Sequence, residues 1–150
     1  MLIKKINIKA VALAISILFV SSLRAQIEIS NYNHVALAVK DIQKSTAFYK
    51  DIIGLQSVEV PDNLREIRSW FSVGATGQLH LLAGRAEAVT NNGLFGSHFS
   101  VTITDADKAL KHLEKHDISY TMRERFDGIR QIFLQDPDGY FIELNESSKK

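Results

Sequence analysis

The sequence predicts an α+β fold built from two tandem βαβββ modules, and three observations lead to this prediction. Residues 33–41 align without a gap with residues 97–105, at a constant offset of 64. In each copy an alternating apolar stretch ends at an aspartate, which is a favourable residue at the N-cap of a helix. Three further β-like stretches follow each predicted helix, separated by glycine or proline. The chain therefore repeats one unit, in residues 31–84 and again in residues 97–146.

In the first module we expect a strand over residues 34–39 and a helix that begins after Asp41. The helical stripe includes Ile42 and Tyr49, and Gly54 is suited to the position just after the last turn. Three strands should follow the helix, because β-branched and aromatic residues are bounded there by proline and glycine. Their expected ranges are residues 55–60, 66–73 and 78–83.

The second module repeats this plan after a linker over residues 85–96. Its first strand is expected over residues 97–103, and its helix carries apolar residues at the spacing i, i+3, i+4, i+7 from Ala106 to Leu113. The sequence Asp-Pro-Asp-Gly at residues 136–139 is typical of a tight turn, which would join the last two strands. The three strands after the helix are expected over residues 118–125, 129–135 and 140–145.

The first 25 residues have the pattern of an export signal. Lysines precede an apolar stretch over residues 10–20, and a small residue, Ala25, stands at a suitable cleavage point before Gln26. The apolar stretch is short for a membrane-spanning helix, so we expect cleavage, with an uncleaved N-terminal anchor as the alternative. The mature protein would be periplasmic or secreted, without stable membrane insertion. Residues 26–30 would form a short leading segment and residues 147–150 a tail.

Charge and cysteine content exclude several classes of protein. The chain has 18 basic and 17 acidic residues, and removal of the four basic residues of the signal leaves 14 basic residues and a net charge of −3. A mature chain with this charge does not suggest a nucleic-acid partner. The absence of cysteine excludes disulfides and a lipid anchor on cysteine, so one apolar core must stabilise residues 31–146.

Four residues of metal-ligand type occupy equivalent places in the two modules. His34 and His98 begin the first strand of each module, and His80 and Glu143 lie in the last strand of each. Side chains alternate between the two faces of a strand. In all four strands the large apolar residues are expected on one face and the candidate ligand on the other. Small residues surround His34 and His98, which is typical of the floor of a cavity. The sequence therefore predicts a metal site on one face.

Other polar residues are weaker candidates. His112 and His116 are spaced i, i+4 on the second helix, away from its apolar stripe, and a solvated face is expected for both. Several arginines and one tryptophan lie on strands that could border the cavity, and most should be surface charges. The set is Arg65, Arg68, Trp70, Arg123, Arg125 and Arg130. We predict substrate contacts from Trp70, Arg68 and Arg130.

Three segments, residues 33–41, 48–55 and 136–144, resemble the vicinal oxygen chelate superfamily. This superfamily includes glyoxalase I, type I extradiol dioxygenases, fosfomycin-resistance thiol transferases and bleomycin-binding proteins. The resemblance covers about residues 31–146. It implies that the paired modules form a cupped, barrel-like mixed sheet around one divalent metal ion. The cup is built either within one chain or from modules of two chains, and the resemblance favours a homodimer.

By position, the resemblance implies that His34, His98 and Glu143 are metal ligands. His80 stands where glyoxalase I has a ligating glutamate, so it is expected either to bind the ion or to lie beside it. With one carboxylate the ion and its protein ligands would carry a charge of about +1, which favours an anionic oxygen ligand. Zn²⁺, Ni²⁺, Co²⁺, Fe²⁺ and Mn²⁺ all suit imidazole and carboxylate together.

The resemblance implies a lyase or isomerase that acts on a small molecule with two neighbouring oxygens, through an enediolate-type intermediate. Glu143 would be the catalytic residue, binding the ion and also moving a proton. The alternatives are an Fe²⁺ extradiol-type dioxygenase that uses His34, His98 and Glu143, a thiol transferase with the same ligands, and a protein that binds a drug or metabolite without catalysis.

Overall fold

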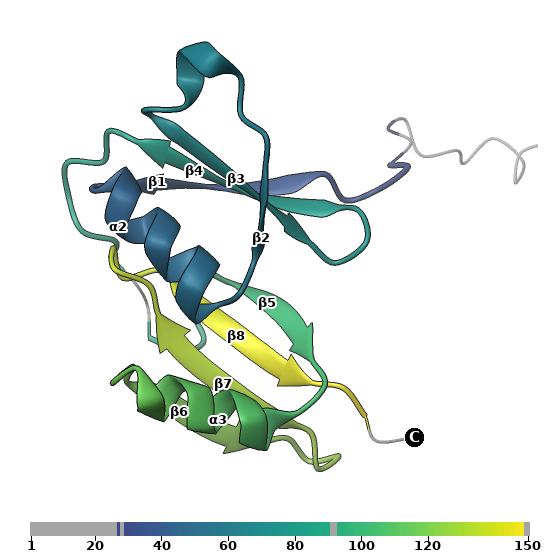
Figure 1. Cartoon of the computed structure of the whole chain (residues 1–150). Helices are drawn as coiled ribbons and strands as arrows, with labels where there is room; N and C mark the ends of the chain where they lie inside the picture. The colour runs from purple at the N-terminus through teal and green to yellow at the C-terminus, as the bar shows by residue number, and fades with distance from the viewer. Residues whose placement is uncertain (1–26, 28, 91–92, 149–150) are drawn as a thin grey trace, which may run out of the picture. The chain divides into compact units, whose positions relative to one another are not determined.

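Two four-stranded mixed sheets form the framework of the chain (Figure 1). The computed structural model describes residues 27, 29–90 and 93–148, so the predicted signal peptide lies outside the described residues. The chain divides into two units, residues 1–31 and 32–150, and the second unit contains every helix and strand given below. Within the described part of the chain, no helix is both long enough and apolar enough to cross a membrane.

The two sheets have the same topology, which confirms the predicted tandem modules. The first and last strands of each module pair in parallel, and the remaining pairs are antiparallel. Sheet A has the order β1 (His34–Val39), β4 (Gly77–Ala83), β3 (Arg68–Val73), β2 (Gln56–Val58). Sheet B has the order β5 (His98–Ile103), β8 (Phe141–Glu146), β7 (Arg130–Gln135), β6 (Tyr120–Glu124). The two sheets remain separate and do not close into a barrel.

The pairing of individual residues between strands is also the same in the two modules. In sheet A, Ala36 lies opposite His80, and in sheet B, Ser100 lies opposite Glu143. Ala36 and Ser100 are related by the same offset of 64 residues that aligns the two modules. His80 and Glu143 therefore occupy equivalent places, as the sequence predicts.

Each module has one α-helix at the expected place among the described residues, and both α-helices begin with the same cap. The carboxylate of Asp41 accepts the N–H of Lys44 ahead of α2 (Ile42–Ala47), and that of Asp105 accepts the N–H of Lys108 ahead of α3 (Ala106–Lys115). These bonds satisfy backbone donors that a helix N-terminus otherwise leaves unpaired. A short 3₁₀ helix, η2 (Asp62–Leu64), follows β2.

The predicted first helix differs from the observed one in its second half. After Ala47 the chain continues as a π-helical turn, η1 (Phe48–Ile52), in which the N–H of Ile53 donates to the carbonyl of Phe48. Gly54 follows with φ +80°, the left-handed conformation that glycine adopts without a steric penalty. Strand β2 is also shorter than predicted, with three residues.

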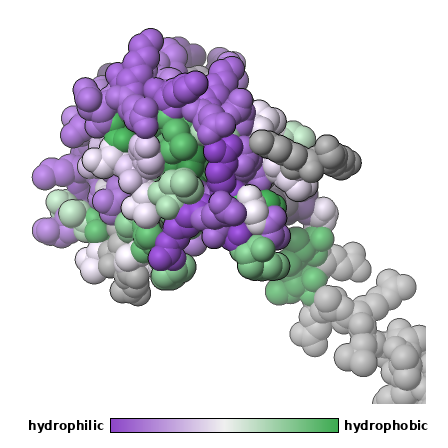
Figure 2. All heavy atoms as spheres, turned by 90° about the horizontal axis from the view of Figure 1, so that it is seen from below, coloured by the Kyte–Doolittle hydropathy of each residue, from purple (hydrophilic) through white to green (hydrophobic). Residues whose placement is uncertain are grey.

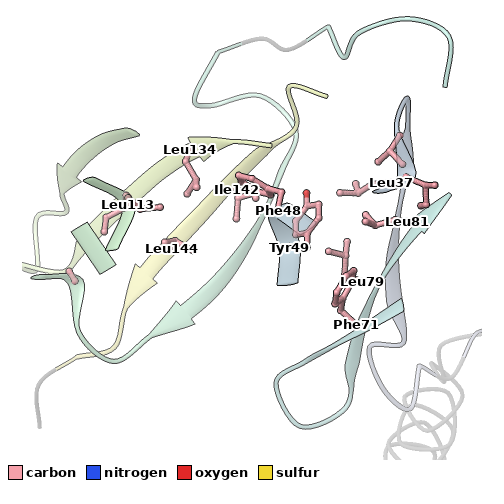
Figure 3. Packing of buried hydrophobic residues seen from close by; sticks show 14 residues of the cluster. Leu37, Phe48, Tyr49, Phe71, Leu79, Leu81, Leu113, Leu134, Ile142 and Leu144 are labelled. Atoms are coloured by element: carbon pink, nitrogen blue, oxygen red, sulfur yellow. The ribbon is translucent and has the colours of Figure 1, made fainter. Parts of the chain in front are cut away.

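Helix α2 and the π-turn η1 contribute the centre of a core that both sheets share. The buried ring of Tyr49 lies 6.2 Å from Phe71 of sheet A and 6.4 Å from Phe99 of sheet B, measured between ring centroids. Figure 3 shows Phe48 and Tyr49 between Leu37, Leu79 and Leu81 of sheet A and Ile142 of sheet B. The burial of large aromatic rings on both sides stabilises the contact between the modules.

A buried polar cluster joins the same helix to the turn at residues 136–139. The hydroxyl of Tyr49 donates to Asp136 Oδ2 at 2.8 Å, and the hydroxyl of Ser45 donates to Asp138 Oδ2 at 3.0 Å. The backbone N–H of Lys40 donates to Asp138 Oδ1 at 2.8 Å. The predicted tight turn of the second module therefore also anchors the helix of the first.

Because the apolar faces of both sheets meet the shared core, the opposite faces of both sheets point away from it. His34 and His80 lie on the outward face of sheet A, and His98 and Glu143 lie on that of sheet B. Figure 2 shows one side of the molecule, on which hydrophilic residues predominate and hydrophobic residues appear in small groups.

Substitution of Tyr49 by phenylalanine should lower the free energy of unfolding by about 1–3 kcal/mol, because the carboxylate of Asp136 would lose a buried donor. Urea denaturation at neutral pH measures this loss. Tyr120→Phe is the matched control, since the Tyr120 hydroxyl donates to Glu114 on the exposed surface, and little change is expected. Equal losses in the two variants would contradict the role given to the Tyr49 bond.

Stability should also depend on the protonation of Asp136. Burial, with a smaller contribution from the neighbouring Asp138, raises the pKa of the Asp136 carboxyl, while hydrogen bonds from Tyr49 and the backbone oppose this shift. The folded state then holds the proton more tightly than the unfolded state, in which the pKa is about 3.9. This contribution to stability is present at low pH and is lost as the pH rises through the folded-state pKa.

We compare the free energy of unfolding of the wild type with that of Asp136→Asn. The wild-type value minus the variant value should fall as the pH is raised from about 3 to 7. Urea titrations of both proteins at several pH values give this difference directly. An excess that grows with pH would contradict the assignment, because it would mean that folding lowers the Asp136 pKa.

Candidate metal centre

His98 and Glu143 form a pair on neighbouring strands of sheet B. Nε2 of His98 lies 2.9 Å from Oε2 of Glu143, and the glutamate is buried. Nδ1 of His98 lies 2.8 Å from the carbonyl oxygen of Gly96. A carbonyl oxygen only accepts hydrogen bonds, so the Nδ1 proton is assigned to this bond and Nε2 faces the carboxylate.

Two amide side chains orient the carboxylate of Glu143. Gln131 Nε2 donates to Oε1 at 2.5 Å, and Asn145 Nδ2 donates to the same oxygen at 2.8 Å. Both bonds go to Oε1, so Oε2 remains the oxygen that faces His98. Hydrogen bonds of this kind hold metal-binding carboxylates and imidazoles in position in many proteins.

The His98 and Glu143 pair fits a divalent ion in its donor chemistry and in its spacing. Nε2 and Oε2 both carry lone pairs, so a positive group, either a proton or a metal ion, must lie between them. Two ligands at about 2.1 Å from an ion and at a right angle to each other lie roughly 3 Å apart. The observed separation of 2.9 Å agrees with this value.

His34 and His80 form the second pair, within a stack of three rings on sheet A. The ring centroids of His34 and His80 are 4.2 Å apart with an angle of 14° between the planes, and Trp70 stacks on the other side of His80 at 4.8 Å. His34 Nδ1 lies 2.6 Å from the amide oxygen of Asn33, and His80 Nε2 lies 2.7 Å from that of Gln78. In the neutral tautomers, each ring keeps one nitrogen lone pair.

These two rings have the chemistry of metal ligands, but they do not point their lone pairs at a common position. Since the planes are almost parallel, the in-plane lone pairs of the two rings do not converge. Burial, and then the nearby His34, lower the pKa of the His80 imidazole, which favours the neutral form that binds metals.

The structure brings the four predicted ligands together as two pairs. Within residues 27, 29–90 and 93–148, no cluster of three or more His, Asp or Glu side chains has a geometry that could hold an ion. The physical reason is the shared core, which turns the outward faces of the two sheets away from the contact between the modules. A four-residue centre within one chain, which is one of the two arrangements that the resemblance implies, is not seen in this part of the chain.

Two of the three predicted substrate contacts lie on the face of the candidate ligands. Trp70 lies opposite His80, and Arg68 lies opposite Leu82, two residues further along β4 on the same face as His80. Arg123 of β6 lies opposite Gln131, on the face of Glu143, and its guanidinium carbon lies 4.9 Å from the ring centroid of Phe95. Cations on both outward faces favour an anionic ligand.

The structure does not bring Arg130 to this face. Arg130 lies on the same face of β7 as Ile132 and Leu134, which is the face toward α3. Its guanidinium makes two 2.9 Å bonds to Glu146 and a 2.5 Å bond to Asp107, and these bonds raise its pKa. Glu146 also accepts the N–H of Ala106, so Arg130 belongs to the start of α3.

The remaining candidates have local partners. Arg65 forms ion pairs with Glu59 and Asp62, and Arg125 pairs with Asp127. His116 is exposed, as predicted. The prediction of a solvated face is wrong for His112, which is partly buried with Nε2 3.0 Å from the carbonyl oxygen of Ile52.

The amide side chains that contact the candidate ligands were not predicted from the sequence. Asn145 and Gln78 each lie two residues from a candidate ligand on the same strand, so strand alternation alone could have indicated both. Gln131 belongs to another strand, and its place beside Glu143 depends on the pairing of β7 with β8. No local signal in the sequence gives that register.

Comparison with known proteins identifies the class. The model of the Glyoxalase/Bleomycin resistance protein/Dioxygenase superfamily matches residues 31–144. The chain is 35% identical over 129 residues to the uncharacterized protein YaeR of Escherichia coli K12, covering 76% of this chain and 94% of YaeR. It is 26% identical over 125 residues to Glyoxylase I 4 of Arabidopsis thaliana, covering 79% of this chain and 71% of the relative.

A solved structure supports the fold. The glyoxalase/dioxygenase from Nostoc punctiforme superposes with a TM-score of 0.69 at 23% identity, covering 85% of this chain and 98% of that one. The chain therefore belongs to the Glyoxalase/Bleomycin resistance protein/Dioxygenase superfamily, which confirms the resemblance drawn from residues 33–41, 48–55 and 136–144.

Loss of an amide that orients Glu143 should weaken metal binding without unfolding the protein. We expect Gln131→Ala to reduce zinc affinity by about tenfold, because the carboxylate would lose one of its two orienting donors. Competition with a chromophoric chelator measures the affinity. Gln135→Ala is the control, since Gln135 shares the strand and face but donates to the carbonyl of Gly139. A similar loss in both variants would argue against a specific role for Gln131.

Proposed function

We propose that this protein is an exported, divalent-metal-dependent lyase or isomerase of the glyoxalase type, acting on a small molecule with two neighbouring oxygens. The observation that carries the proposal is the pair of complementary half-sites, His34 with His80 and His98 with Glu143, on equivalent outward faces of two equivalent modules. Membership of the superfamily and the similarity to a protein named Glyoxylase I 4 support it.

The metal site of this proposal is completed in a homodimer. The outward face of sheet A in one copy would meet the outward face of sheet B in the other, so that each half-site finds its complement. A two-fold axis makes this contact twice and gives two identical sites. Within one chain the shared core keeps the same two faces apart.

An exposed aromatic side chain beside the second module supports such a contact. Phe95, in the linker, is 80% exposed, and Arg123, beside Phe95, lies on the same face of sheet B as Glu143. Exposed aromatic and arginine side chains near one face are typical of residues that become buried in a protein interface.

In the proposed reaction, His34 and His80 of one copy and His98 and Glu143 of the other would hold the ion. The ion, when bound, supplies Lewis acidity that stabilises negative charge on two neighbouring substrate oxygens. Trp70 offers an apolar wall beside His80, and Arg68 and Arg123 offer positive charge to an anionic substituent. Residues on both faces would exclude water from the enclosed substrate.

Glu143 is the group that moves the proton in this proposal. Glu143 is 6% exposed, and the two amides on Oε1 leave Oε2 as the oxygen that would leave the ion and take a proton from a carbon next to a carbonyl. The same oxygen would return the proton to the neighbouring carbon, which gives an isomerisation through an enediolate-type intermediate.

Mixing two defective variants tests whether each site uses two copies. One variant carries His34→Ala with His80→Ala, and the other carries His98→Ala with Glu143→Ala. Neither should bind zinc alone. After unfolding and joint refolding, random pairing makes half of the dimers mixed, and each mixed dimer has one complete site, so zinc content should recover to about a quarter of the wild-type value. Elemental analysis after removal of unbound zinc measures it.

In the matched control, only one of the two variants is unfolded and refolded, so that every dimer carries the same substitutions in both chains. Refolding the His34→Ala, His80→Ala variant with itself should give no recovery. Recovery in neither mixture would contradict the two-copy site, and stoichiometric zinc in the separate variants would contradict the ligand assignment. His116→Ala should keep the wild-type zinc content, because that residue belongs to neither pair.

The proton transfer can be tested without knowledge of the natural substrate. The zinc-loaded protein in D₂O should exchange the carbon-bound proton next to the carbonyl in some member of a panel of α-hydroxy aldehydes and ketones, as followed by proton NMR. Glu143→Gln should lower the exchange rate at least about a hundredfold. Oxygen uptake with catechols under Fe²⁺, without proton exchange, would instead support ring cleavage.

A further inference from the structure

A pocket of about 470 Å³ lies between the two modules, on the side of sheet B opposite to His98 and Glu143. Its walls come from the end of η1 and from β3 in the first module, and from β5, β8 and α3 in the second. The lining is mainly apolar and includes Ile53, Leu55, Val73, Val101, Ala109 and Leu113. This volume is in the range of sites that bind small molecules.

The pocket is a built feature of the contact between the modules. Leu113 and Leu144, both labelled in Figure 3, belong to the shared core and also line the pocket, so its inner wall is rigid packing. At one side His112 lies with Nε2 3.0 Å from the carbonyl oxygen of Ile52, which joins α3 to η1. An apolar ligand in this pocket would remove its apolar walls from water, so an apolar occupant would be favoured.

Three titratable side chains line the pocket: Asp51 from η1, and Lys108 and His112 from α3. Helix α3 also has two acids, but both already have partners. Asp107 pairs with Arg130, and Glu114 accepts the hydroxyl of Tyr120. Lys108 is therefore the lysine that this helix offers to the pocket, and Asp51, on the other wall, is the charge that would attract a cationic head group instead.

We propose that this pocket binds an amphipathic carboxylate, with an unbranched apolar tail between the modules and its carboxylate at Lys108. The apolar lining accounts for the tail, and Lys108 supplies the positive charge for the carboxylate. A tail of about ten carbon atoms or fewer suits the volume. This site is separate from the metal ligands, and it does not depend on the proposed reaction.

Octanoate, 1-octanol and octylammonium are suitable probes, because they share one tail and differ in head-group charge. Calorimetric titration of the whole protein at neutral pH should give the order octanoate tightest, octanol next and octylammonium weakest. Lys108→Gln should weaken octanoate binding roughly three- to fivefold and leave octanol binding unchanged. Lys111→Gln is the control on the same helix, since Lys111 does not line the pocket, and should behave as wild type.

The place of binding can be read in the wild-type protein by amide NMR. Octanoate should shift the signals of Gly54 and Gly74, which line the pocket, and should leave that of Gly128 in the turn between β6 and β7 unchanged. Ala109→Phe should abolish binding of octanoate and octanol by filling the space, with circular dichroism as a check on folding. Val73→Phe serves the same purpose from the opposite wall if Ala109→Phe does not fold.

Octylammonium binding as tight as octanoate binding would overturn the assignment of the head group to Lys108. Absence of shifts at Gly54 and Gly74 under saturating octanoate, or unchanged octanoate affinity in a folded cavity-filling variant, would overturn the site itself. None of these results depends on zinc, so they are distinguishable from a failure of the metal site.

Discussion

The insertion of Tyr49 between the two sheets is the interaction on which the rest of the structure depends. Its ring packs on Phe71 of one module and Phe99 of the other, and its hydroxyl donates to Asp136 in the turn of the second module. A fully buried hydroxyl needs such an acceptor, since an unpaired one costs free energy. The apolar and polar contacts of the Tyr49 side chain, which belongs to η1, therefore hold the two modules together.

This packing decides where the candidate metal ligands lie. Each sheet uses one face for the shared core and turns the other face outward. The histidine pair on sheet A and the histidine and glutamate pair on sheet B are thus both on outward faces, each supported by amide side chains. In the proposed function, a metal centre that uses both pairs is completed by two chains.

The fold and the site differ in the kinds of contact that they use. The core and the buried polar cluster around Asp136 and Asp138 hold the modules together with mostly apolar packing and short hydrogen bonds. The outward faces carry stacked rings, amides and cations around the candidate ligands. Between the modules the packing is incomplete, and the resulting pocket has an apolar lining with Lys108 at its edge.

The sequence by itself determined the modules, because the repeat, the helix caps at Asp41 and Asp105 and the alternation of apolar residues are local patterns. Those patterns also placed His34, His80, His98 and Glu143 on the non-core faces of their strands. Only the tertiary structure decided that the four residues separate into two pairs, that Gln131 supports Glu143 and that Arg130 serves α3. The physical reason is that strand register and the contact between modules depend on packing between residues far apart in the chain.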